Sequence, residues 1–217
     1  MSISARQRQR AAAILDQLTE SYPEAACALH FRNPYELLVA TILSAQCTDV
    51  RVNLVTPELF ARYPDAAALA AGDANALESV IHSTGFYRNK SKNLIGCAQA
   101  LVEQHGGEVP RSMAELVALP GVGRKTANVV LGNAYGIPGM VVDTHVGRVA
   151  GRLGWSDASD PTKIEADLCR LIPKDRWTLT SHLLIAHGRA CCKAPTPHCS
   201  RCPLDELCPR NGVERWR

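Results

Sequence analysis

The sequence predicts an all-α protein, because its apolar residues recur at the spacing of helix faces and no convincing alternation of apolar and polar residues appears. Val141-Val142 is too short a run to count as a strand. Helix-start signals and breakers divide the chain into separate segments. With 217 residues, 46% of them hydrophobic, the chain can bury a core in one domain or in two modest lobes.

Two helices are expected near the N-terminus. Residues 4–18 are helix formers whose apolar positions share one face, and Tyr22-Pro23 ends this segment. Asn33-Pro-Tyr-Glu36 then combines an N-cap, a proline at the first helical position and a glutamate at the third. This start signal predicts a second helix over residues 35–47.

Further helices follow along the chain. Asp49 can cap a third helix, which Pro57 is expected to kink or split. The remaining helical segments are expected over residues 73–82, 89–105, 144–153, 161–171 and 177–190. In the last segment the residues expected to face inward are Leu179, Leu183, Leu184 and Ala186.

The stretch Leu119-Pro-Gly-Val-Gly-Arg-Lys-Thr-Ala-Asn128 predicts a turn between two short helices. Glycine tolerates positive φ, so Gly121 and Gly123 permit a tight turn that exposes backbone N–H groups at the start of the second helix. Such a helix start favours a phosphate, and Arg124 and Lys125 add positive charge. On the turn alone, an ordinary corner between helices remains an equal alternative.

The join between the two middle helices, residues 83–88, places Phe86 and Tyr87 beside Arg88, Lys90 and Lys92. Aromatic rings next to positive charge suit entry into a base stack while the backbone is held. The alternative is a solvated charged helix with its aromatic rings turned toward the core.

The nine cysteines divide into two groups. Four are scattered among apolar residues and are interpreted as small buried hydrophobic residues: Cys27, Cys47, Cys97 and Cys169. Four of the others have six, two and five residues between them: Cys192, Cys199, Cys202 and Cys208. A proline-rich loop with a C-x-x-C core can wrap a metal centre, either zinc or an iron-sulfur cluster. Cys191 adjoins the first of these four ligands.

Composition limits the location and the partners. No apolar run approaches the roughly 20 residues of a membrane span, and the N-terminus is too poor in apolar residues for a signal peptide. A cytosolic location with reduced thiols is therefore expected. The net charge is +3, and residues 188–217 hold six Lys/Arg against three Asp/Glu. A locally basic chain suits contact with a phosphate backbone, although a solvated basic tail is as compatible with the charge alone.

Three motifs together resemble the endonuclease III family of helix-hairpin-helix DNA glycosylases. They are the hairpin followed by Val141-Val-Asp-Thr-His145, the Leu43-Ser-Ala-Gln46 motif, and the cysteine spacing. The resemblance covers nearly the whole chain and implies a six-helix lobe over residues 27–137. Residues 1–26 and 138–217 would form a second lobe, and DNA would bind across the cleft between the lobes.

The same resemblance assigns the chemistry. Lys125 would be the nucleophile and Asp143, 18 positions later, the second catalytic group. Without the resemblance, capping of the following helix is the simpler role for Asp143. Gln46 and Phe86 would fill the gap left by an extruded base. The family has a leucine where this chain has Phe86, which makes the wedge bulkier.

The resemblance also selects a [4Fe-4S] cluster over zinc for the four cysteines of the C-terminal loop. Lys193 and Arg201 lie within that loop and could present positive charge to phosphate. The implied function is a monomeric, bifunctional DNA glycosylase and AP lyase for oxidised pyrimidines in duplex DNA, located in the cytoplasm and at the nucleoid when bound. A monofunctional glycosylase and a non-catalytic DNA-binding module are the alternatives, and Lys125 argues against both.

Overall fold

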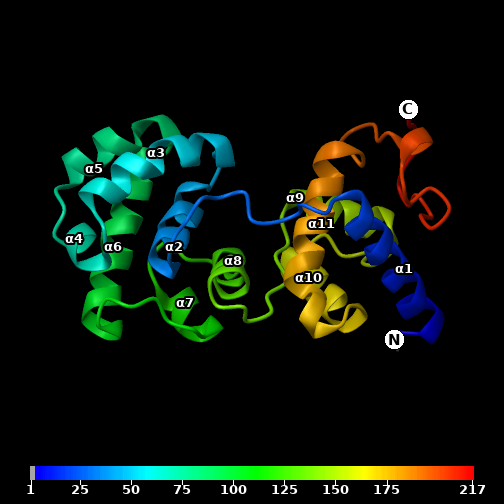
Figure 1. Ribbon diagram of the computed structural model, residues 1–217, viewed down its shortest axis with the longest axis horizontal. Coiled ribbons are helices and arrows are strands. Elements are labelled where there is room, and N and C mark those ends of the chain that lie inside the picture. Colours follow the sequence, from blue (N-terminus) through cyan, green and yellow to red (C-terminus); the bar gives the residue numbers. More distant parts are fainter. Residues whose placement is uncertain (1–2) are drawn as a thin grey trace. The chain divides into compact units, whose positions relative to one another are not determined.

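The computed structural model describes residues 3–217, and every regular element among them is a helix (Figure 1). The all-α prediction is therefore confirmed. Contacts divide the chain into two compact units, one of Cys27–Ile137 and one of Met1–Ala26 with Pro138–Arg217. Within the described residues, no helix combines the length and the apolar character that crossing a membrane requires.

The unit Cys27–Ile137 contains seven α-helices, one more than expected, because the five-residue α4 was not foreseen. The helices enclose a core that includes Leu37, Leu59 and Leu94. In chain order they are α2 (Pro34–Leu43), α3 (Asp49–Arg62), α4 (Ala66–Ala70), α5 (Ala74–Ile81), the 3-10 turn η1 (His82–Thr84), α6 (Tyr87–His105), α7 (Met113–Ala118) and α8 (Arg124–Ala134).

Local signals explain how α2 begins and where the prediction for it was wrong. Asn33 accepts a hydrogen bond from the backbone N–H of Glu36 at 2.9 Å, and Pro34 occupies the first turn, as predicted. The helix ends at Leu43 and not at residue 47, because the chain turns through residues 44–46 and Gln46 has a left-handed backbone.

Helix α3 differs from the expectation at two positions. Its N-cap is Thr48, whose side chain accepts from the Arg51 N–H at 3.2 Å, and Asp49 is the first helical residue. Pro57 does not split the helix. A proline removes one helical hydrogen bond, but buried residues on both sides of it, including Val55 and Leu59, keep α3 packed on the core.

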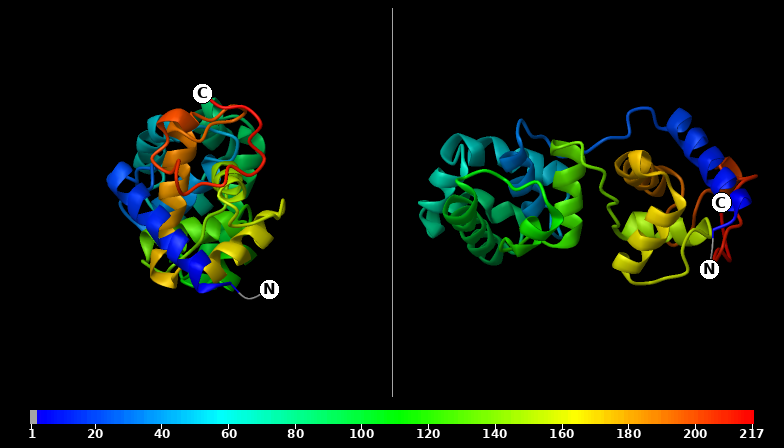
Figure 2. Two further views of the ribbon diagram at one scale, coloured as in Figure 1. Left: turned by 90° about the vertical axis from the view of Figure 1, so that its right-hand side faces the viewer. Right: turned by 90° about the horizontal axis from the view of Figure 1, so that it is seen from below.

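The second unit contains α1 (Ala5–Ser21), α9 (Thr144–Arg152), α10 (Pro161–Leu171), the 3-10 turn η2 (Lys174–Arg176), α11 (Trp177–Ala190) and the 3-10 turn η3 (Cys199–Arg201). Its core gathers Leu15, Val146 and Leu184. Leu179 was expected to face inward but is exposed at the start of α11. Helix α1 lies beside the C-terminal loop (Figure 2), where Arg10 donates a hydrogen bond to the Leu207 carbonyl at 3.2 Å.

Candidate active site and cysteine loop

The hairpin consists of α7, a turn over residues 119–123, and α8. Gly121 has φ +76°, and a Cβ atom built there would lie 2.7 Å from the Asn93 Cβ. Both the backbone conformation and the close approach of α6 therefore require glycine at this position. Gly123 differs from the prediction, because its φ is −93° and a Cβ atom would meet open space.

Gly123 is instead the N-cap of α8, where no side chain caps the helix. Arg124 and Lys125 are the first two residues of α8, and both are exposed. Val122 stabilises the turn, because its side chain is buried and its backbone N–H donates a hydrogen bond to the Leu119 carbonyl at 3.1 Å. The hairpin thus presents the start of a helix, with two cationic side chains, at the surface.

Asp143 lies in the other unit and is the N-cap of α9. Its Oδ1 accepts a hydrogen bond from the Val146 N–H at 2.8 Å. The capping role that the sequence allowed is therefore present. Capping by Oδ1 fixes the direction of the carboxylate.

A cavity of the first unit brings together Gln46, Phe86 and Gly121, three of the residues predicted to contact DNA. The other lining residues come from α2, the turn after it, and α6: Ile42, Ala45, Asn89, Lys90 and Asn93. In the described part of the chain, three residues other than glycine have positive φ, and Gln46 (51°) and Phe86 (49°) are two of them. Strained backbone of this kind is concentrated at functional sites.

Phe86 is 67% exposed. The alternative interpretation of residues 83–88 turned both aromatic rings toward the core. It is wrong for Phe86, whereas Tyr87 is partly buried and packs against the core. Phe86 is the N-cap residue of α6 and has φ 49° and ψ 28°, directly after Gly85 with φ 70°. Tyr87, predicted to lie in the loop, is the first residue of α6, and its ring lies 4.5 Å from that of His82.

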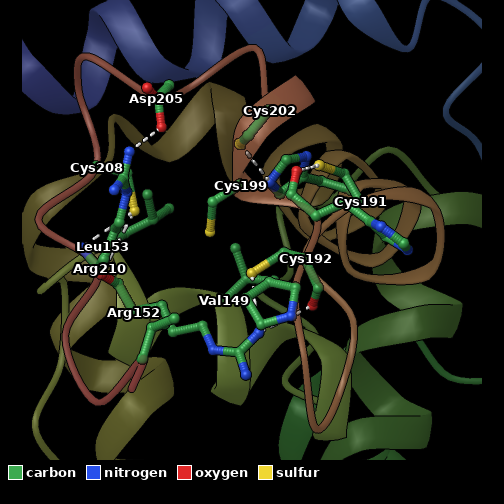
Figure 3. A pocket seen from close by; sticks show the side chains of 14 residues that line it. Val149, Arg152, Leu153, Cys191, Cys192, Cys199, Cys202, Asp205, Cys208 and Arg210 are labelled. Atoms are coloured by element: carbon green, nitrogen blue, oxygen red, sulfur yellow. Dashed lines mark hydrogen bonds and ion pairs between the residues drawn. The ribbon is translucent and has the colours of Figure 1, made fainter. Parts of the chain in front are cut away.

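The C-terminal loop places the four predicted ligand cysteines around one cavity: Cys192, Cys199, Cys202 and Cys208. Figure 3 shows the sulfur atoms of Cys192 and Cys199 directed into this cavity. Leu204, which is 1% exposed, anchors the loop in the core of its unit. An all-thiol set around a shared space is the donor chemistry of a zinc or an iron-sulfur site.

Three of these sulfurs accept hydrogen bonds, which suits thiolate ligands. The backbone N–H of Leu204 donates to Cys202 Sγ and that of Arg210 to Cys208 Sγ, each at 3.4 Å, and Arg152 donates to Cys192 Sγ at 3.3 Å. Burial raises the pKa of the Cys202 thiol to about 12. A bound metal ion deprotonates its thiol ligands, so the residues present fit a metal centre.

Cys191 and His187 lie close to Cys202 but are not among the four predicted ligand cysteines. Their ligand atoms and Cys202 Sγ lie within 4.8 Å of one another. Cys191 also lines the cavity (Figure 3), but its thiol donates to the His198 carbonyl at 3.3 Å. His187 is buried, which lowers its pKa to about 4 and leaves the ring neutral. Its Nδ1 contacts the Tyr22 hydroxyl at 3.0 Å, and its Nε2 lies 3.7 Å from Cys202 Sγ.

The structure also shows loop contacts that the sequence did not indicate. Arg148 and Arg152, four residues apart on α9, donate to the Cys192 carbonyl at 3.0 Å and 3.3 Å, and Arg152 donates to the Lys193 carbonyl at 2.8 Å. Their spacing places both on one helix face, but no local pattern identifies carbonyls of a distant loop as partners. Lys193 and Arg201, predicted to contact DNA, are both exposed.

Comparison with known proteins places this arrangement in a family. The model of the HhH-GPD superfamily, base excision DNA repair proteins, matches residues 39–174. Endonuclease III of Synechocystis sp. is 57% identical over 206 residues, which cover 94% of each protein. Endonuclease III of Escherichia coli strain K12 is 42% identical over 195 residues, or 90% of this chain and 92% of that protein.

Solved structures give the same result. A non-covalent endonuclease III-DNA complex has a TM-score of 0.88, and a trapped endonuclease III-DNA covalent intermediate has a TM-score of 0.89. Both are 46% identical to this chain and cover 94% of it, and the matches extend over 95% and 96% of those chains. This chain therefore belongs to the endonuclease III family of the HhH-GPD superfamily, whose activity is that of a bifunctional base excision repair glycosylase and lyase.

Proposed function

We propose that Lys125 is the nucleophile of this glycosylase and lyase, and that its substrates are oxidised pyrimidines and abasic sites in double-stranded DNA. The observation that carries the proposal is the position of Lys125 as an exposed amine in the first turn of a helix that no side chain caps. A relative that is 46% identical was trapped as a covalent intermediate with DNA.

The proposed reaction forms a bond between the Lys125 amine and C1′ of the damaged nucleotide, while the bond from C1′ to the base breaks and the base leaves. Loss of the amine proton and opening of the sugar ring give a Schiff base. Removal of a proton from C2′ then expels the 3′ phosphate and cuts the strand. The turn residues Gly121 and Gly123, with Arg124 at the start of α8, would hold a backbone phosphate during these steps.

Asp143 is proposed to assist deprotonation of the lysine and to stabilise positive charge on the sugar. Because asparagine caps a helix about as well as aspartate, Asp143→Asn should preserve the thermal stability and lower turnover by roughly 10²-fold or more. Asp143→Ala should lower turnover and also cost about 1 kcal/mol of stability through the lost cap. Single-turnover rates and thermal unfolding of both variants separate the two roles. Full turnover by Asp143→Asn would leave Asp143 as a cap only.

Gln46 and Phe86 are proposed to fill the gap left when the target nucleotide is extruded, since both line the cavity beside Gly121. Phe86→Ala should slow processing of an abasic site in a duplex by about tenfold, because a duplex must be opened and its gap filled at a cost of a few kcal/mol. The same site in a single strand should be affected much less. The measurement is the ratio of the two single-turnover rates, and equal losses on both substrates would exclude this role.

The cysteine loop is proposed to hold a [4Fe-4S] cluster through Cys192, Cys199, Cys202 and Cys208. Such a cluster, when bound, supplies a rigid centre around which the loop folds. The chain's own residues would then present Lys193 and Arg201 to DNA phosphates as exposed cations. We expect the protein to act as a monomer.

One assay distinguishes the proposed activity from its two alternatives. Duplexes carrying either one oxidised pyrimidine or one abasic site are incubated with the protein, and base release and strand scission are followed separately. Base release with cleavage supports the bifunctional enzyme. Base release without cleavage would indicate a monofunctional glycosylase, and binding without either product a DNA-binding module.

A further inference from the structure

Lys90 is a buried lysine in the first unit. It lies on α6, is 4% exposed, and lines the cavity that Gln46 and Phe86 share. Lysine is almost never fully buried unless it is paired, and its Nζ donates a hydrogen bond to the Thr84 carbonyl at 2.8 Å. The reaction proposed above does not use this side chain.

The Thr84 carbonyl lies directly before the two residues with positive φ. Thr84 is the last residue of η1, and its own hydroxyl donates to the Ile81 carbonyl at 2.8 Å. Gly85 and Phe86 follow, both with positive φ. The backbone N–H of Lys90 donates to the Phe86 carbonyl at 3.0 Å. Lys90 therefore bonds to the chain on both sides of Gly85, once through its side chain and once through its backbone.

A left-handed phenylalanine persists only where surrounding contacts determine the backbone. We propose that Lys90 is a positioning residue that holds the segment Thr84–Phe86 in this conformation, so that the exposed Phe86 ring is ready to enter the base stack. The inference rests on the proposed wedge role of Phe86. Lys90 acts through that loop and does not contact the substrate.

Another role is open to a buried amine in this cavity. Burial lowers the pKa of Lys90, and a neutral amine can attack C1′ as the Lys125 amine does. The geometry favours positioning, because the Lys90 Nζ is buried and bonded to a carbonyl, whereas Lys125 is exposed at a helix start. The two roles predict different behaviour of an arginine variant.

The test is a double-mutant cycle on an abasic site in duplex and in single-stranded DNA. Lys90→Met keeps an unbranched side chain only one atom shorter and removes the donor. It should lower the duplex rate by about tenfold and the single-strand rate by less than about twofold. In the Phe86→Ala background it should have almost no further effect, because the group it positions is gone. Lys163→Met, on the exposed surface of α10, is the matched control and should change neither rate.

Each outcome decides one point. If Phe86→Ala alone shows no duplex-specific loss, the wedge role fails, whatever Lys90 does. If Phe86→Ala shows the loss but Lys90→Met slows both substrates equally in both backgrounds, Lys90 is only structural and the inference is overturned. Lys90→Arg retains a donor and should recover most of the duplex rate and of borohydride trapping. Loss of borohydride trapping in Lys90→Arg would instead indicate that Lys90 is the nucleophile.

A second measurement covers a Lys90→Met protein that does not fold. Lys90→Gln has a shorter, uncharged side chain whose amide donor does not reach as far as the lysine ammonium. Its loss of duplex rate should likewise vanish in the Phe86→Ala background. Amide hydrogen exchange of the folded variant should be faster over residues 84–87 than in the native protein. Unchanged exchange there would contradict the positioning role.

Discussion

Borohydride added during the reaction is expected to trap the native protein on abasic DNA and to trap neither Lys125→Arg nor Lys125→Gln. A Schiff base needs a primary amine that can lose its proton, and a guanidinium with a pKa above 12 offers none. Turnover of both variants should fall by roughly 10³-fold or more, because removal of a covalent nucleophile leaves only binding and positioning. Lys125→Arg should still bind the duplex, since its positive charge remains.

Arg124→Gln is the matched control, because Arg124 is the neighbouring exposed cation at the same helix start. If it contacts one phosphate, its loss should weaken binding and reduce the salt dependence by about 0.9 in the slope of log K against log salt. Trapping should survive at saturating enzyme. Trapping by Lys125→Gln, with the adduct mapped to another amine, would remove Lys125 from this role, and Lys90 is the first amine to inspect.

The starts of α2 and α9 were predictable because the signals that define them are local. Asn33 caps α2, and Asp143 caps α9, each with a side chain that bonds to the third helical N–H. Local sequence signals did not show which of the two hairpin glycines requires the absence of a side chain. Gly121 is required by its φ and by the approach of Asn93, whereas Gly123 lies in open space, and contact between α6 and the turn is not encoded in either segment.

The left-handed backbone of Gln46 and Phe86 was not predictable, because residues other than glycine adopt it only under tertiary constraint. The burial of Lys90 had a signal in the sequence. Lys90 shares the helical period of Leu94 and Leu101, which are buried, whereas Lys92 is off that face and exposed. Periodicity therefore distinguishes the buried Lys90 from the exposed Lys92. It does not identify the Thr84 carbonyl as the hydrogen-bond acceptor of Lys90, which only the fold shows.

Cys199→Ser is expected to lose the proposed cluster, with its broad absorbance at about 400 nm, and to fold poorly. The reason is the small amount of other structure in the loop. Between Cys192 and Cys208 the described chain forms one 3-10 turn, Cys199–Arg201, and Leu204 is the loop residue with the deepest burial in the core of its unit. Metal binding to such a loop contributes directly to its folding free energy.

Cys191→Ser is the matched control, because Cys191 adjoins the proposed ligand Cys192 and its thiol donates to the His198 carbonyl. It should keep the absorbance and the iron content of the native protein and lose little thermal stability. Iron, sulfide and zinc are measured in both variants. A colourless, active native protein with stoichiometric zinc would exclude the cluster. Loss of metal from Cys191→Ser as complete as from Cys199→Ser would instead assign the metal to the group His187, Cys191 and Cys202, whose ligand atoms lie within 4.8 Å of one another.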